Sequence, residues 1–165
     1  MFNSAVKNFF YSFAVVAVTA VLASLFNQVG MDSFYDSIQL SELNPPNYVF
    51  PLVWGILYVI LIAAFYLILE APRHKVIKIR PAIQFFLANM FLQVLWCYAF
   101  FYCGHFLAGL VIIVVLDVLT MIMMEVFYKL HKVAGLMLIP YLLWLLFASY
   151  LNWSVVVLNG VMFVM

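Results

Sequence analysis

The chain contains five long apolar stretches, at roughly residues 8–29, 48–70, 82–103, 105–128 and 133–158. Each is long enough to cross a bilayer as a helix, which takes roughly 20 apolar residues. Polar residues gather between them: residues 30–47 carry acids and prolines, and residues 71–80 read APRHKVIKIR. Only residues 103–105 separate the third and fourth stretches, so a tight turn joins two antiparallel neighbours. The pattern predicts an all-α integral membrane protein, with five transmembrane helices in one domain over residues 1–165.

Composition supports the same fold class. Hydrophobic residues make up 70% of the chain and charged residues 8%, whereas a soluble domain is roughly half apolar and about a quarter charged. A net charge of +1 argues against a nucleic-acid partner, because phosphate binding needs clustered basic residues. Cys97 and Cys103 form no CxxC pair and offer no zinc spacing, so they are interpreted as membrane-embedded thiols. Neither a metal site nor a required cofactor is expected.

The basic residues predict an orientation, since Lys and Arg stay on the cytoplasmic side of short loops. With five crossings, all seven basic residues lie on one side of the membrane, and the 30–47 loop on the other side has none. The seven are Lys7, Arg73, Lys75, Lys78, Arg80, Lys129 and Lys132. We therefore expect a bacterial cell envelope, with a cytoplasmic N-terminus and an outward C-terminus if the membrane is the inner one. A cleaved signal peptide is the alternative for the first stretch, because Lys7 precedes the apolar run and Ala23 and Ser24 are small. That run is longer than a signal core, and its loss would leave an even number of spans.

Aromatic and amide side chains recur at helical spacing in three stretches, so that each set shares one face of its helix. The second stretch has Phe50, Trp54 and Tyr58; the third has Asn89, Gln93, Trp96 and Phe100; the fifth has Tyr141, Trp144, Ala148, Asn152, Val155 and Asn159. One reading is packing, in which small residues let helices approach and amides bond across them. The other is a cavity for a large flat apolar ligand, because Trp and Tyr offer rigid faces with polar handles.

Asp117 lies near the middle of the fourth stretch, where an unpaired charge costs at least about 2.5 kcal/mol. It is either a proton or cation site, or a neutral acid bonded to a neighbouring helix through Asn89 or Gln93. Glu125 and Lys129, four residues apart, predict an ion pair that acts as an anchor. The histidines fall in loops or at span ends. His74 and His131 are interpreted as solvated surface residues. His105 lies alone on the other side, where it could ligate a haem iron only without a second protein ligand.

Two segments, residues 45–58 (PPNYVFPLVWGILY) and 134–152 (AGLMLIPYLLWLLFASYLN), resemble motifs of the TspO/MBR family, in the same order and spacing. That family contains the bacterial tryptophan-rich sensory proteins and the mitochondrial translocator protein, once called the peripheral benzodiazepine receptor. Residues 96–101 (WCYAFF) are similar to its W-x-x-x-F-F element, and the resemblance covers roughly residues 44–159. The family fold has five transmembrane helices, in agreement with the number counted from hydropathy.

The resemblance implies a membrane protein that binds porphyrins such as protoporphyrin IX and haem, and other flat hydrophobic small molecules, in sensing, transport or regulation. Trp54 and Trp144 match tryptophans tied to porphyrin handling, which includes a light-dependent, enzyme-like breakdown as the alternative activity. The expected pocket lies among the second, third and fifth helices beneath the 30–47 loop. Its expected ligand-binding residues are Tyr48, Phe50, Trp54, Tyr58, Asn89, Gln93, Trp96, Tyr141, Trp144, Ala148, Leu151 and Asn152.

The chain departs from the family pattern at several positions. Tyr48 replaces a Trp, and the amides of the third helix are exchanged, with Gln93 for Asn and Asn89 for Gln. A homodimer is expected, although the first helix lacks the glycines that many members show. Sterol binding is not expected, because no basic residue follows Tyr150, and the match at Val126, Tyr128 and Lys132 is a weak pattern.

Overall fold

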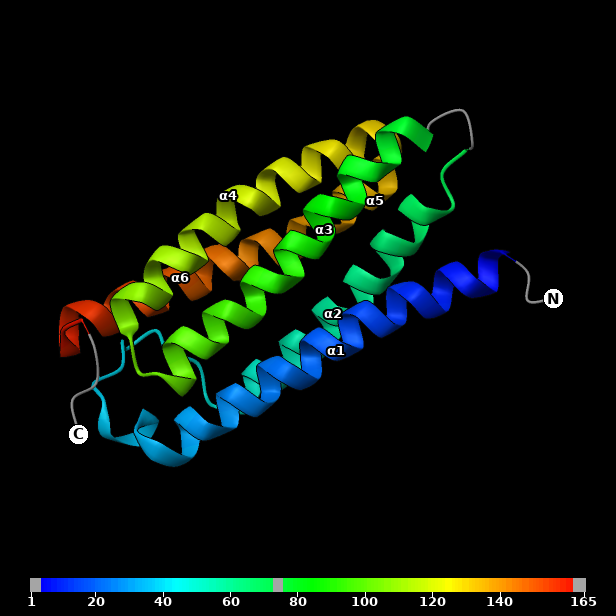
Figure 1. Cartoon of the computed structure of the whole chain (residues 1–165). Helices are drawn as coiled ribbons and strands as arrows, with labels where there is room; N and C mark the ends of the chain where they lie inside the picture. Colours follow the sequence, from blue (N-terminus) through cyan, green and yellow to red (C-terminus); the bar gives the residue numbers. More distant parts are fainter. Residues whose placement is uncertain (1–3, 73–75, 162–165) are drawn as a thin grey trace.

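The computed structural model describes residues 4–72 and 76–161, with the backbone alone for 76–78, and in these residues it contains helices and no strand. The elements in chain order are α1 (Ser4–Ser33), the short 3-10 helix η1 (Tyr35–Ser37), α2 (Val49–Leu69), α3 (Val76–Cys97), the π-helical turn η3 (Tyr98–Tyr102), α4 (Phe106–Leu130), α5 (Lys132–Met137) and α6 (Ile139–Asn159). Within the described residues, five stretches are long and apolar enough to cross a membrane. The predicted all-α bundle of five transmembrane helices is thus confirmed (Figure 1).

The spanning helices run alternately up and down, so the two ends of the chain lie at opposite ends of the bundle (Figure 1). One end, here called the basic end, carries Lys7, Arg80, Lys129 and Lys132 where α1, α3, α4 and α5 begin or finish. The opposite, acidic end holds the loop between α1 and α2. Arg73, His74 and Lys75 lie outside the described residues, as does the side chain of Lys78.

Local sequence explains where the spanning segments break. The third span ends in the π-helical turn, where the Cys103 amide donates to the Tyr98 carbonyl at 2.9 Å. Gly104 then adopts a φ of 63°, a left-handed conformation that glycine reaches without steric cost. The fifth span is interrupted between α5 and α6, because Pro140 has no amide hydrogen to donate. Helix α1 extends beyond the predicted 8–29, since backbone hydrogen bonding continues past the apolar residues that mark the stretch.

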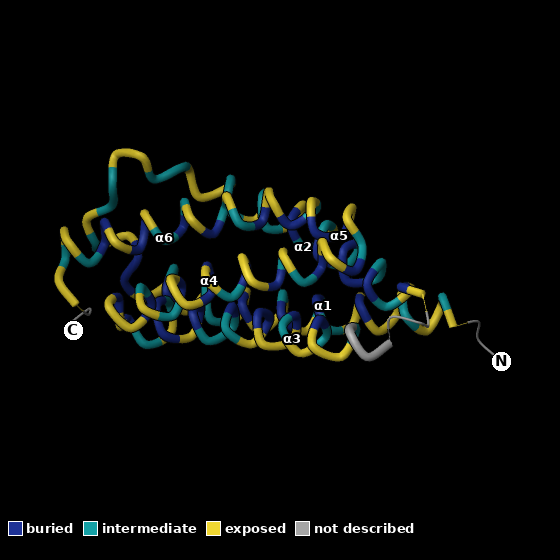
Figure 2. The backbone as a smooth tube through the Cα atoms, turned by 90° about the horizontal axis from the view of Figure 1, so that it is seen from above, coloured by how far each residue is buried: buried dark blue, intermediate teal, exposed yellow. Residues whose placement is uncertain are grey.

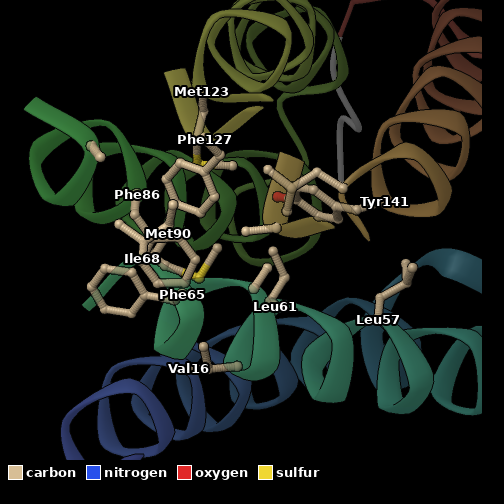
Figure 3. Close-up of a cluster of buried hydrophobic side chains, with 14 of the residues drawn as sticks. Val16, Leu57, Leu61, Phe65, Ile68, Phe86, Met90, Met123, Phe127 and Tyr141 are labelled. Carbon is tan, nitrogen blue, oxygen red and sulfur yellow. The ribbon is translucent and has the colours of Figure 1, made fainter. Parts of the chain in front are cut away.

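The basic half of the bundle is filled with apolar side chains. Phe65 of α2 stacks on Phe86 of α3 with ring centroids 3.9 Å apart, and Phe86 lies 6.2 Å from Phe127 of α4 (Figure 3). All three are fully buried, and burial follows the inward faces of the helices along the bundle (Figure 2). The outward faces carry exposed apolar residues, as expected for helices that contact lipid. This packed half fixes the helices around a looser half at the acidic end.

Candidate functional site

The acidic half contains a cavity of about 570 Å³ between α1, α2 and α3, within the range of roughly 300–1,000 Å³ typical of small-molecule sites. Helix α2 contributes Phe50, Trp54 and Tyr58, so the predicted stripe does share one face and that face lines the cavity. The rings of Trp54 and Tyr58 are 5.5 Å apart. From the third span, Trp96 and Gln93 line the opposite side.

The remaining wall comes from α1, where the sequence pattern had placed the fifth helix. Ala20, Ala23 and Asn27 line the cavity together with Ser24, Gln28 and Met31. Sequence reasoning missed this wall because α1 is strongly apolar and reads only as a span. A signal was present, since small and polar residues at positions 20, 23, 24, 27 and 28 follow the spacing of one helical face.

The loop between α1 and α2 lines the acidic end of this cavity with the buried Tyr35 and the exposed Asn47. The ring of Phe101 of η3 lies 6.0 Å from that of Tyr35. Burial raises the pKa of the Tyr35 phenol above its ordinary value, so this side chain is a neutral hydroxyl in the cavity wall. Its O–H donates to the Asn44 side-chain oxygen at 3.4 Å.

A polar pair lies at the deep end of the cavity. The Gln93 amide nitrogen donates to the Tyr58 hydroxyl at 2.8 Å, and Gln93 is fully buried. Its carbonyl oxygen has no hydrogen-bond partner among the described residues. A buried acceptor left unpaired costs about 1–3 kcal/mol. The pair therefore forms a buried polar end to the cavity, in which the Gln93 oxygen itself is closed off from the open space.

A smaller pocket of about 40 Å³ adjoins the large cavity, and both are lined by Phe50 and Trp96. Ala148, Leu151 and Asn152 of α6 line this smaller space. The Trp96 indole N–H donates to the Asn152 side-chain oxygen at 3.0 Å. Helix α6 therefore orients a wall residue of the large cavity without lining that cavity itself.

Four of the predicted ligand-binding residues line neither cavity: Tyr48, Asn89, Tyr141 and Trp144. The Tyr141 hydroxyl donates to the Asn89 side-chain oxygen at 2.7 Å, and the Asn89 amide donates to Thr120 at 2.7 Å. These buried bonds tie α6, α3 and α4 together. Tyr48 is 72% exposed at the start of α2.

Trp144 lies behind the cavity wall. Its ring meets that of Phe50 edge-on at 5.9 Å, and Phe50 separates it from the large cavity. Its indole nitrogen is buried without a hydrogen-bond partner among the described residues. Whether these outlying residues contact a ligand stays a prediction.

Asp117 has a different partner from those predicted. Ser149 of α6 donates to one carboxylate oxygen at 2.7 Å, while Asn89 and Gln93 bond elsewhere. The expected bond to a neighbouring helix is therefore present, but the expected partners Asn89 and Gln93 were wrong, because Asp117 faces α6 whereas Thr120, on the next turn of α4, faces α3. The second oxygen of Asp117 is buried with no partner in the described residues.

The other charged residues and the described histidines lie apart from the cavity, whereas Cys97 lines it. The predicted Glu125–Lys129 ion pair is confirmed at 2.5 Å with both side chains largely exposed, where such pairs contribute about 0–1 kcal/mol. Within the described ranges, no group of three His, Cys, Asp or Glu residues is placed to hold a metal ion. His131 accepts from the Ala134 amide at 3.3 Å at the start of α5, and both cysteines are free thiols.

Fold and site together define a helical membrane protein with an aromatic-walled internal cavity at one end of its bundle. The chain belongs to the TspO/MBR family, whose sequence profile matches residues 12–158. It is 35% identical to the tryptophan-rich protein TspO of Chlorobaculum tepidum over 76% of this chain and 79% of that protein. It is 32% identical to the protein of the same name from Archaeoglobus fulgidus, over 88% and 96%. The tryptophan-rich sensory protein of Cereibacter sphaeroides is 31% identical, over 78% of each chain.

Proposed function

We propose that this protein binds porphyrins, protoporphyrin IX or haem, in the cavity between α1, α2 and α3, and acts in porphyrin sensing, transport or regulation. The observation that carries the proposal is a cavity of about 570 Å³ with Trp54 and Trp96 in its walls. Two indoles offer wide rigid faces for a flat macrocycle. The name of one relative, the tryptophan-rich sensory protein of Cereibacter sphaeroides, supports a role in sensing.

The polar groups of the cavity suit an amphipathic macrocycle. At the deep end, the hydrogen-bonded pair of Tyr58 and Gln93 gives the wall a polar group. Toward the acidic end, the amides of Asn27, Gln28 and Asn47 can donate to the carboxylates of a porphyrin. None of the described lining residues is charged, so neutral hydrogen bonds and stacking supply the recognition.

Titration of protoporphyrin IX into the protein in lipid nanodiscs tests the proposal. We expect a saturable shift of the porphyrin absorption band with quenching of tryptophan fluorescence. Trp54→Phe should weaken binding several-fold, because it removes an indole face from the wall. Trp153→Phe is the matched control, because Trp153 is 51% exposed and lines neither cavity. Absence of any saturable change with the wild-type protein would refute porphyrin binding.

Light-dependent porphyrin degradation is a second candidate, favoured by the position of Trp54 in the cavity wall. An indole stacked on a photoexcited porphyrin can pass it an electron, and dioxygen would serve as the oxidant that breaks the macrocycle. Loss of the porphyrin band under illumination, with air and without, measures this activity. We expect Trp54→Phe to slow the loss more than Trp144→Phe, since Phe50 lies between Trp144 and the cavity. Equal rates in wild type and the double variant would exclude participation of these residues.

We further propose that the basic end faces the cytoplasm of a bacterial cell. Lys7, Arg80, Lys129 and Lys132 gather at that end, and cytoplasmic loops retain Lys and Arg. Reporter fusions test the orientation: a fluorescent protein fused at the C-terminus should stay dark outside the cytoplasm, whereas alkaline phosphatase there should be active. The opposite pattern would reverse the orientation.

A further inference from the structure

Helices α1 and α2 contact each other closely in the basic half. There the Asn8 amide donates to the Glu70 carboxylate at 2.7 Å, and the rings of Phe9 and Tyr66 lie 6.4 Å apart. In the acidic half, α1 packs on η3 instead. Phe26 lies 5.3 Å from Tyr98, and the two helices are left separated by the cavity.

The residues along this separation are both exposed and part of the cavity wall. Ser24 and Gln28 on α1, and Pro51 and Gly55 on α2, are exposed and line the cavity. A side chain with both properties marks an opening. Because these residues belong to spanning segments, the opening faces the bilayer. Gly55 is six residues into α2, about 9 Å along the axis at roughly 1.5 Å per residue.

The opening between α1 and α2, lined by Ser24, Gln28, Pro51 and Gly55, is here called the slit. Gly55 leaves open space in this slit. A Cβ atom built at Gly55 would meet no atom within 4 Å, so close helix packing does not require glycine here. By contrast, a Cβ at Gly30 would lie 2.7 Å from the Phe101 carbonyl oxygen. Glycine within a helix costs about 1 kcal/mol relative to alanine. At Gly55 this cost is not offset by a closer contact between helices. The missing side chain only widens the mouth of the cavity.

The loop at the acidic end is fixed to the rest of the bundle. The loop between α1 and α2 is bonded to the end of α6, where the Gln39 amide donates to Asn159 at 2.7 Å and the Asn159 amide donates back to the Gln39 carbonyl at 2.8 Å. Ser41 and Tyr150 share a further hydrogen bond at 3.2 Å. Within this loop Tyr35 is buried, whereas Asn47 is exposed, and both line the cavity. A route from water at this end is therefore the alternative that the measurements below separate from a route through the slit.

We propose that the ligands of this cavity enter from the bilayer through the slit between α1 and α2, and that Gly55 sets the width of that entrance. The molecules admitted are flat and mainly apolar, so that they dissolve in lipid and pass between two helices. Recognition follows inside, at the aromatic walls. The porphyrin measurement below rests on the proposed function, whereas the thiol measurement does not.

The thiol measurement uses Cys97, a cavity-lining residue, as a reporter of access in a Cys103→Ser background. N-phenylmaleimide dissolved in the bilayer should alkylate Cys97, and Gly55→Phe should slow that reaction at least tenfold. Val59→Phe is the control, because Val59 is 66% exposed one turn further along α2 and does not line the cavity. Unfolding would speed the alkylation, so a slower reaction cannot arise from misfolding. An unreactive Cys97, or an equal rate in Gly55→Phe, would overturn the proposal.

The porphyrin measurement follows transfer of protoporphyrin IX from loaded vesicles to the protein by stopped-flow tryptophan quenching. Gly55→Phe should lower the association rate constant at least tenfold, and Val59→Phe should leave it unchanged. A Gly55→Phe variant that associates at the wild-type rate contradicts entry through the slit. A wild type that binds no porphyrin refutes the proposed ligand, while the alkylation rates still decide the entrance.

Discussion

The hydrogen bond between Trp96 and Asn152 predicts a measurable coupling between the third and fifth spans. The indole N–H and the amide oxygen are 3.0 Å apart, and the Asn152 amide also donates to the Phe106 carbonyl at 3.0 Å. Asn152→Ala leaves the Trp96 indole N–H without its partner and removes one of the donors to the Phe106 carbonyl, in a site where Trp96 is 7% and Asn152 2% exposed. Unpaired buried groups cost about 1–3 kcal/mol, and membrane double-mutant cycles average about 0.6 kcal/mol with values up to about 1.7. We expect Asn152→Ala to lower the free energy of unfolding by about 2 kcal/mol.

A double-mutant cycle with Trp96→Phe isolates the bond itself. Unfolding in mixed micelles, followed by circular dichroism, should give a coupling energy of about 1 kcal/mol, because both groups are desolvated and well aligned. The control cycle pairs Asn152→Ala with Trp54→Phe. Among the described residues, no hydrogen bond joins Trp54 to Asn152, so the coupling energy of this pair should be close to zero. A Trp96–Asn152 coupling below about 0.3 kcal/mol, within the error of independent sites, would refute the reasoning.

Three further substitutions test the packing of the bundle, each by its thermal unfolding midpoint. Gly30→Ala places a Cβ 2.7 Å from a backbone oxygen of η3 and should destabilise by about 1–3 kcal/mol; a midpoint equal to wild type would contradict the close approach. Asp117→Asn keeps an oxygen that can accept from Ser149 and replaces an ionisable group in the bilayer by a neutral one, so its midpoint should not fall. Tyr141→Phe leaves the Asn89 oxygen without its 2.7 Å partner and should cost about 1 kcal/mol; no change would show that this bond adds no net stability.

Hydropathy predicted the five spans well, because a helix that crosses lipid must satisfy its backbone internally and be apolar over a fixed length. The turn at Cys103–His105 followed from the same constraint. The stripe of Phe50, Trp54 and Tyr58 correctly indicated a face that lines a cavity. Such stripes are visible in sequence because residues four apart in a helix lie one above another.

Periodicity did not predict which neighbour each stripe meets. The stripe on α6 has the same spacing as that on α2, yet Tyr141 bonds to Asn89 and lines neither cavity. Asp117 likewise turned toward Ser149, since a helix can rotate about its axis without changing its pattern. The α1 wall was missed for a related reason: Ala20 and Ala23 add no polarity to an apolar span, and their small size matters only beside a cavity.

Filling the cavity from α1 is the most direct test of the account. Ala20→Phe introduces a ring at a residue that lines the cavity, whereas Ala14→Phe introduces the same ring at an exposed position of α1 outside it. Protoporphyrin IX titration should show at least a tenfold loss of affinity in Ala20→Phe and wild-type affinity in Ala14→Phe. Wild-type affinity in Ala20→Phe would place the porphyrin outside the cavity between α1, α2 and α3 and contradict the account.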